Sequence, residues 1–164
     1  MKLDFKSFKY SYMQTQDFTT SIEVEQSPME AYNAINKVSS WWPGEFEGNS
    51  DKLNEEFIYR YQDMHYSKQK VVELVPGKKI VWLITDSLLD FVENKTEWTG
   101  TKVIFDISTV NGKTKIQFTH EGLIPKFQCY KDCHNAWTAI IGKSLQTFIA
   151  TGKAWQMQEE LVFD

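Results

Sequence analysis

The sequence of 164 residues has few of the residues that a disulfide framework, a nucleic-acid surface or a membrane span requires. Its two cysteines, Cys129 and Cys133, lie in one short stretch, unlike the spaced cysteines of small secreted domains. Arg60 is the only arginine, and 22 acidic residues outnumber 18 basic ones, which argues against nucleic-acid binding. No segment approaches the roughly 20 apolar residues of a membrane helix, and the first residues do not resemble a signal peptide. We therefore expect a cytoplasmic protein with no membrane span and no nucleic-acid partner.

The motifs of common catalytic and cofactor sites are also missing. The patterns G-x-S-x-G, H-E-x-x-H and G-x-G-x-x-G do not occur. A zinc site needs about four ligands, and Cys129, Cys133 and His134 are far in sequence from His65 and His120. We expect no metal, no cofactor and two reduced structural thiols.

Aromatic residues, in contrast, are abundant. They make up 15% of the chain, with six Trp, seven Tyr and eleven Phe. This content indicates either a bulky core or an aromatic-lined cavity, because ligand sites are mostly apolar and contain few polar groups.

The first half of the chain begins with a strand and two short helices. Residues 18–24 alternate apolar and polar side chains, which predicts a half-buried strand. The Ser-Pro-x-Glu pattern at 27–30 is a capping box with proline at the first helical position, and it predicts a helix over about 28–37. A second short helix is predicted at 39–42, ended by the Pro-Gly pair that follows.

Six more strands and a long helix follow. Pro-Gly at 76–77 and Asn-Gly at 111–112 are turn signals, and Asn-Gly is the strongest short hairpin signal. Apolar residues at three- and four-residue steps predict a long amphipathic helix over about 129–151. The fold class is therefore α+β, with an antiparallel sheet and helices on one face. We expect one domain over 17–153, with an N-terminal extension at 1–16 and a C-terminal tail at 154–164.

Several segments are familiar: SPMEAYNAI, WWPGEFEGN, YRYQDMH, VPGKKIVW, TEWTGTKVIFDIS, GKTKIQFTHEGL and CYKDCHNAWTAIIGKSLQTFIATGK. Together they resemble the START-related SRPBCC helix-grip superfamily, in its bacterial branch grouped with the activator of the heat-shock-protein-90 ATPase. The likeness covers about residues 17–153. It implies a curved antiparallel sheet of about six or seven strands around a long C-terminal helix. It also implies a deep apolar cavity between them and a small hydrophobic ligand, with a chaperone as the alternative partner.

Candidate residues for this cavity come from the aromatic and polar positions of the strands and helices. Trp41 and Trp42 are adjacent, so one is expected to face the core or cavity and the other the outer surface or the mouth. Strand alternation makes Arg60 and the tyrosines beside it alternatives, since only one set can face the cavity. His120 is either a polar anchor in the cavity or a strand-end histidine bonded to the backbone, and core packing is the alternative for each tryptophan. The candidate ligand-binding residues are Trp41, Trp42, Tyr59, Arg60, Tyr61, Trp82, Trp98, Phe118, His120, Trp137 and Ile141.

The leading functional hypothesis is non-catalytic binding of a small hydrophobic ligand, lipid-like or aromatic. A chaperone-linked interaction module is one alternative. A cyclase- or hydrolase-type enzyme that uses His120 or Arg60 is the other. The apolar connection predicted at 87–95 would act as a lid over the cavity mouth or as a contact surface.

Overall fold

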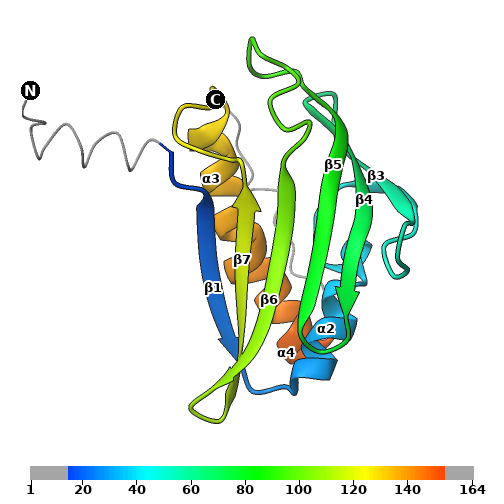
Figure 1. Cartoon of the computed structure of the whole chain (residues 1–164), viewed down its shortest axis with the longest axis vertical. Helices are drawn as coiled ribbons and strands as arrows, with labels where there is room; N and C mark the ends of the chain where they lie inside the picture. The colour runs from blue at the N-terminus through cyan, green and yellow to red at the C-terminus, as the bar shows by residue number, and fades with distance from the viewer. Residues whose placement is uncertain (1–14, 154–164) are drawn as a thin grey trace, which may run out of the picture.

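The structure is a computed structural model in which residues 15–153 are described. The tail expected at 154–164, and nearly all of the extension expected at 1–16, lie outside the described residues. The described chain forms the expected α+β helix-grip fold, with a seven-stranded antiparallel sheet and a long C-terminal helix that crosses one face of it (Figure 1).

The seven strands pair in the order β1-β7-β6-β5-β4-β3-β2. The first strand therefore pairs with the last, and β1 and β2 form the two edges of the sheet. All other neighbours are consecutive in sequence, as expected for a meander of hairpins. The strands are β1 (Phe18–Val24), β2 (Glu45–Gly48), β3 (Glu56–Tyr61), β4 (His65–Val75), β5 (Lys79–Leu89), β6 (Lys102–Val110) and β7 (Lys113–Glu121).

The long helix is continuous but not uniform. It comprises α3 (Tyr130–Ala139), a π-helical segment η2 (Ile140–Leu145) and α4 (Gln146–Thr151). Its last part contacts both α2 (Pro28–Ile35) and β1, so the C-terminal helix and the first strand and helix close one end of the fold (Figure 1). The predicted range of 129–151 is confirmed, whereas the π segment has no signal in the apolar pattern.

The local signals explain how α2 begins and ends. The capping box is complete, since the Glu30 N–H donates to Ser27 Oγ at 3.1 Å and the Ser27 N–H donates to Glu30 Oε2 at 3.3 Å. The helix ends at Ile35, two residues before the predicted end. The Lys37 N–H instead donates to the Ala34 carbonyl at 3.0 Å, which tightens the chain toward the 3₁₀ turn η1 (Val38–Ser40).

The Asn-Gly signal between β6 and β7 is also confirmed. Asn111 and Gly112 both have positive φ, 53° and 80°, as a two-residue hairpin turn requires.

The predicted connection at 87–95, however, starts too early. Strand β5 continues to Leu89, which is fully buried, and the connection to β6 spans residues 90–101. Among residues 15–153, no helix combines the length and the apolar character that crossing a membrane demands.

Candidate functional site

The adjacent tryptophans both lie inside the fold. Trp41 and Trp42 are 1% and 2% exposed, so the prediction that one of them faces outward is wrong. They follow the 3₁₀ turn η1 at a bend rather than in a regular element, so alternation does not separate their rings. The Trp41 indole N–H donates to the Ile35 carbonyl at 3.0 Å, and the Trp42 ring stacks on Tyr59 with centroids 3.9 Å apart.

Aromatic rings fill the space between the sheet and the long helix. Trp137 of α3 stacks on Trp98 with centroids 5.8 Å apart, and it also contacts Trp42 at 5.0 Å and Phe118 at 4.6 Å. The cavity that remains has a volume of about 20 Å³. This volume holds about one water molecule, so the deep cavity expected from the resemblance is absent from the described structure.

The small cavity, named here the aromatic cavity, contains four of the residues predicted from the sequence. It is lined by Trp42, Tyr59, His65, Trp98, Cys133, Ala136, Trp137 and Ile140. The other predicted aromatic and aliphatic residues are buried in the surrounding core: Trp41, Tyr61, Trp82, Phe118 and Ile141. Ile140 lines the cavity in place of the predicted Ile141.

Arg60 lies on the opposite face of the sheet. Its neighbours Tyr59 and Tyr61 are buried, and alternation therefore directs Arg60 outward, where its side chain is 44% exposed. Its guanidinium lies 5.2 Å from the centre of the Tyr66 ring and 3.5 Å from the Glu47 carboxylate. The expectation that Arg60 serves the cavity is wrong.

A chain of hydrogen bonds holds the neutral His120 ring in one tautomer. The Trp137 indole N–H donates to His120 Nδ1 at 3.1 Å, so this nitrogen accepts and Nε2 carries the proton. Nε2 lies 2.8 Å from Thr101 Oγ1, which in turn donates to the Trp98 carbonyl at 2.6 Å. Both nitrogens of His120 are therefore engaged, and neither is placed to move a proton to a molecule in the aromatic cavity. This geometry removes the predicted acid–base role of His120.

His65 is the polar residue of the cavity wall that the sequence analysis missed. It begins a buried stripe on β4 together with Ser67 and Gln69, and its Nε2 lies 3.1 Å from Ser67 Oγ. Gln69 also donates to Ser67 Oγ. The missed signal is alternation itself, because His65, Ser67 and Gln69 precede the buried Val71 in steps of two. Their polarity suggests an exposed face, whereas the structure buries it.

Burial also sets the charge state of the ionisable groups here. It lowers the pKa of His65 to about 3, and burial together with the nearby His65 lowers the pKa of His120 to about 3. Burial and the neighbouring Tyr61 raise the pKa of Tyr59, whose hydroxyl donates to the Pro43 carbonyl at 2.7 Å. Burial and the adjacent Cys129 raise the pKa of Cys133. The aromatic cavity is therefore lined by neutral groups at physiological pH.

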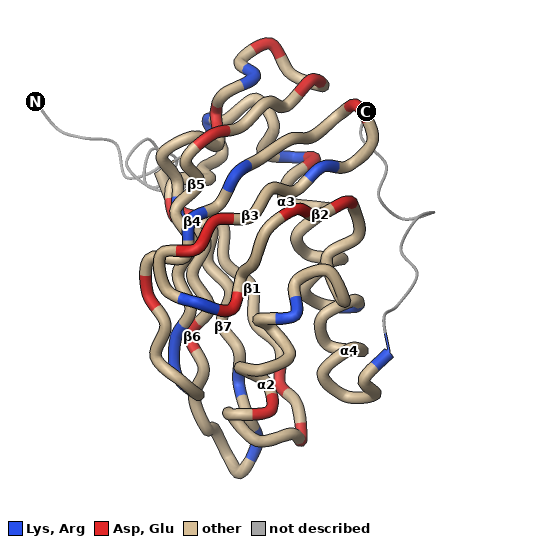
Figure 2. Tube along the Cα trace, turned by 90° about the vertical axis from the view of Figure 1, so that its right-hand side faces the viewer, with Lys and Arg blue, Asp and Glu red and all other residues tan. Residues whose placement is uncertain are grey.

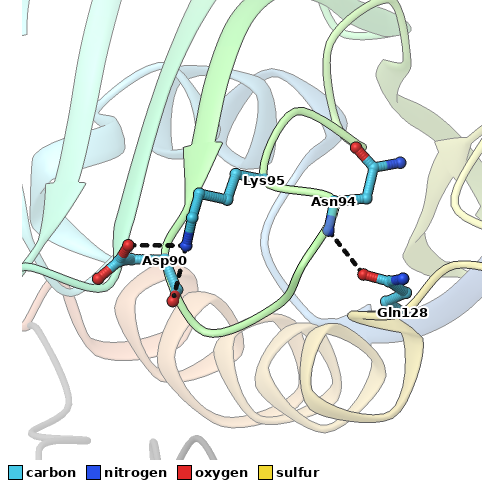
Figure 3. A network of polar contacts seen from close by, with 4 residues as sticks. All are labelled: Asp90, Asn94, Lys95 and Gln128. Atoms are coloured by element: carbon cyan, nitrogen blue, oxygen red, sulfur yellow. Dashed lines mark hydrogen bonds and ion pairs between the residues drawn. The ribbon is translucent and has the colours of Figure 1, made fainter.

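The 90–101 connection closes the cavity from one side, because it carries Trp98. Cys129 is the N-cap residue of α3, and its side chain makes no capping hydrogen bond. The Glu97 carboxylate takes over this role, because it accepts hydrogen bonds from the backbone N–H groups of Gln128 at 2.7 Å and Cys129 at 3.1 Å. The Asn94 N–H donates to Gln128 Oε1 at 2.7 Å, as Figure 3 shows. The connection thus depends on the start of α3 for its position, and α3 depends on the connection for its N-terminal cap.

Neither cysteine belongs to a metal centre in this part of the chain. Cys129 and Cys133 are both buried free thiols. Within the described residues, no group of three or more His, Cys, Asp or Glu side chains is arranged to hold a metal ion.

The two buried histidines predict acid destabilisation. The unfolded chain binds a proton on each below the ordinary pKa of 6.5, whereas the folded chain keeps both neutral down to about 3. The unfolded state therefore binds more protons in this window, so stability is full above it and falls as the pH drops. We expect the free energy of unfolding to fall by up to about 1.4 kcal/mol per pH unit for each histidine.

Urea denaturation between pH 6.5 and about 5, above the range of most carboxylates, measures this slope. His65→Gln should reduce the slope by about half, because one of the two histidines is removed. Imidazole NMR shifts provide a second readout, and those of His65 and His120 should stay at their neutral values across this range. A His65 or His120 signal that titrates in the folded protein near pH 6.5 would contradict the assignment.

Three known structures share the architecture over most of the chain. The solution structure of the Aha1 dimer from Colwellia psychrerythraea superposes with a TM-score of 0.68 at 22% identity, covering 85% of this chain and 99% of that chain. EF2215 from Enterococcus faecalis, described as a conserved protein of unknown function, has a TM-score of 0.60 at 13% identity, with 98% and 90% covered. CV1439 from Chromobacterium violaceum has a TM-score of 0.59 at 14% identity, with 81% and 96% covered. At these identities the likeness shows the fold.

No curated protein matches the chain. The family model described as "Activator of Hsp90 ATPase homolog 1-like protein" matches residues 13–150, which is most of the sequence. The match includes every strand and helix of the described fold except Thr151, the last residue of α4. The chain therefore belongs to the family of activator of Hsp90 ATPase homolog 1-like proteins.

Proposed function

We propose that this protein binds a small planar aromatic molecule with a hydrogen-bond acceptor, without catalysis, at the aromatic cavity. The walls support an aromatic occupant, because Trp42, Tyr59, Trp98 and Trp137 present ring faces and edges to one small space. Their neutral surroundings favour an uncharged ligand over an ion.

The observation that carries this proposal is the buried indole N–H of Trp98. Trp98 is 3% exposed and lines the cavity, and its Nε1 reaches no oxygen or nitrogen acceptor among residues 15–153; the Cys133 thiol on the same wall is only a weak acceptor. A buried donor without an acceptor costs about 1–3 kcal/mol, a weak acceptor offsets little of this, and a carbonyl acceptor on a ligand would recover more. His65, edge-on to the Trp98 ring at 4.5 Å, supplies a second polar group on the same wall.

The resting cavity of about 20 Å³ is too small for a ring system, so binding requires the cavity to open. The 90–101 connection is the segment best suited to move. It carries Trp98 and is an irregular segment between two strands. The hydrogen bonds that Glu97 accepts from, and Asn94 donates to, the start of α3 are contacts that break when it moves. Displacing it moves one wall of the cavity while the sheet and the long helix stay in place.

Coumarin and naphthalene test the proposal as a matched pair, since both are flat bicyclic molecules and coumarin alone carries a carbonyl acceptor. We expect coumarin to bind roughly fivefold more tightly, which corresponds to about 1 kcal/mol for one net hydrogen bond. The Trp98 indole N–H signal should shift in NMR spectra on titration with coumarin. Trp98→Phe should remove the preference, because the ring remains and the donor is lost.

Ala136→Leu provides a separate check, because it extends a larger side chain from α3 into the aromatic cavity. We expect this variant to bind neither coumarin nor naphthalene. Asn135→Leu is the control, since this neighbouring position is exposed. The proposal is wrong if neither compound moves the Trp98 signal at millimolar concentration, or if Ala136→Leu binds coumarin as well as the wild type does.

Access through the 90–101 connection gives a kinetic prediction. Glu97→Gln replaces a carboxylate that accepts two backbone N–H groups with an amide that has one acceptor oxygen. We expect faster association of coumarin and faster amide hydrogen exchange at Gln128 and Cys129 than in the wild type. Glu93→Gln, an exposed change on the same connection, should alter neither rate. An unchanged association rate in Glu97→Gln would show that the ligand enters elsewhere.

A second candidate function, activation or binding of a chaperone, is favoured by a row of residues on the outer face of the sheet. Arg60, Tyr66 and Leu88 pair across β3, β4 and β5, and Leu88 is 48% exposed. Arginine and tyrosine are enriched at the energetic centres of protein interfaces. The family model names an activator of the Hsp90 ATPase, which supplies the class of partner.

Leu88→Asp tests this candidate in an ATPase assay with an Hsp90-type chaperone. We expect the wild-type protein to raise the ATPase rate and Leu88→Asp to weaken apparent affinity by about tenfold, as for one interface anchor. Val75→Asp is the control, because Val75 is also exposed but lies at the far end of β4. An ATPase rate unchanged by saturating wild-type protein would exclude activation, and the absence of a complex in a pull-down with the same chaperone would exclude binding.

A further inference from the structure

A second and much larger hollow lies outside the core. We name it the α2–β2 groove. One side is the second half of α2 with the segment that follows it, and the other side is the end of β2 with the loop at 49–51. Its volume is about 660 Å³, within the range of small-molecule sites. It shares no lining residue with the aromatic cavity, so it is a separate feature of the molecule.

The groove combines an aromatic floor with amide walls. Tyr32 and Phe57 are buried beneath it. Three asparagines, Asn33, Asn36 and Asn49, stand around this floor from both sides. Each carboxamide provides two N–H donors and an acceptor oxygen, so the walls offer donors and acceptors together.

The charge of the groove is balanced. Lys37 and Asp51 are the two charged residues of its lining, and they carry opposite signs. In Figure 2, Lys and Arg positions are likewise interspersed with Asp and Glu positions along the described chain. An anionic ligand such as a phosphate ester would need a cluster of cations, which the lining does not provide.

One amide of the groove has an unused acceptor. Asn36 Oδ1 is shielded from solvent and accepts no hydrogen bond within residues 15–153. The backbone carbonyl of Asn36, in contrast, accepts a hydrogen bond from Ser50 Oγ at 2.7 Å, and this bond connects the 49–51 loop to the end of α2. The Asn36 carboxamide therefore has acceptor capacity that no described residue uses.

From these features we propose that the α2–β2 groove binds a neutral, polyhydroxylated ring molecule of the saccharide class. Sugar hydroxyls both donate and accept, and they match the three carboxamides in a way that an apolar molecule cannot. The C–H faces of a sugar ring are apolar and can pack on Phe46, the half-buried aromatic residue of the lining, while the hydroxyls at the ring edge reach the walls. This function is independent of ligand binding in the aromatic cavity.

NMR titration of the intact chain with maltose and with N-acetylglucosamine tests this proposal. We expect the side-chain amide signals of Asn33, Asn36 and Asn49 to shift at millimolar sugar, while the Trp98 indole signal stays in place. The double variant Asn33→Ala/Asn49→Ala should weaken binding by about tenfold, as expected for the loss of one or two hydrogen bonds. Both of these positions are exposed, so the fold should be retained.

Asn94→Ala is the matched control, because Asn94 is an exposed asparagine outside the groove lining and its hydrogen bond to Gln128 uses the backbone N–H. Its affinity for the sugars should equal that of the wild type. The proposal is overturned if no sugar shifts the groove amides, if the double variant binds as well as the wild type, or if glucose 6-phosphate binds more tightly than glucose. Shifts confined to Trp98 and Ala136 would place the sugar in the aromatic cavity and would also overturn it.

Discussion

A chain of three hydrogen bonds connects the long helix, the sheet and the 90–101 connection. It runs from the Trp137 indole through the His120 ring and the Thr101 hydroxyl to the Trp98 carbonyl. Each member is buried, so breaking one link would leave a polar group without a partner in an apolar interior. The position of the helix over the sheet therefore depends on a histidine that stays neutral.

This dependence explains why the interior contains polar side chains among so many aromatic rings. Ring packing alone is tolerant of small rotations, whereas a hydrogen-bond chain accepts one arrangement of donors and acceptors. Trp137 takes part in both, since it stacks on Trp98 and donates to His120. The same residues that fill the space under the helix thus also set its orientation.

The molecule separates its features between two faces of the sheet and one edge. The face covered by the long helix holds the aromatic cavity, which is closed at rest and lined by neutral groups. The outer face carries the row of Arg60, Tyr66 and Leu88. The α2–β2 groove lies at the β2 edge and is open and polar. These regions have different chemistry, so a single assay would not report on all of them.

The order of elements was predictable from the sequence because its signals are local. A capping box starts α2, Asn-Gly turns the last hairpin, and the spacing of apolar residues marks the long helix. Four aromatic residues of the cavity, Trp42, Tyr59, Trp98 and Trp137, were also predictable, since large apolar residues on the inner faces of the elements meet under the helix.

Only the tertiary structure decided what these residues do together. Whether the rings leave a large cavity or fill it depends on how closely the helix approaches the sheet, and packing distance has no signature in sequence spacing. The burial of His65, Ser67 and Gln69 follows from their pairing with neighbouring strands under the helix, although their polarity indicates an exposed face. The cap that Glu97 provides to α3 joins residues about 30 positions apart, and such contacts form only when the chain has folded.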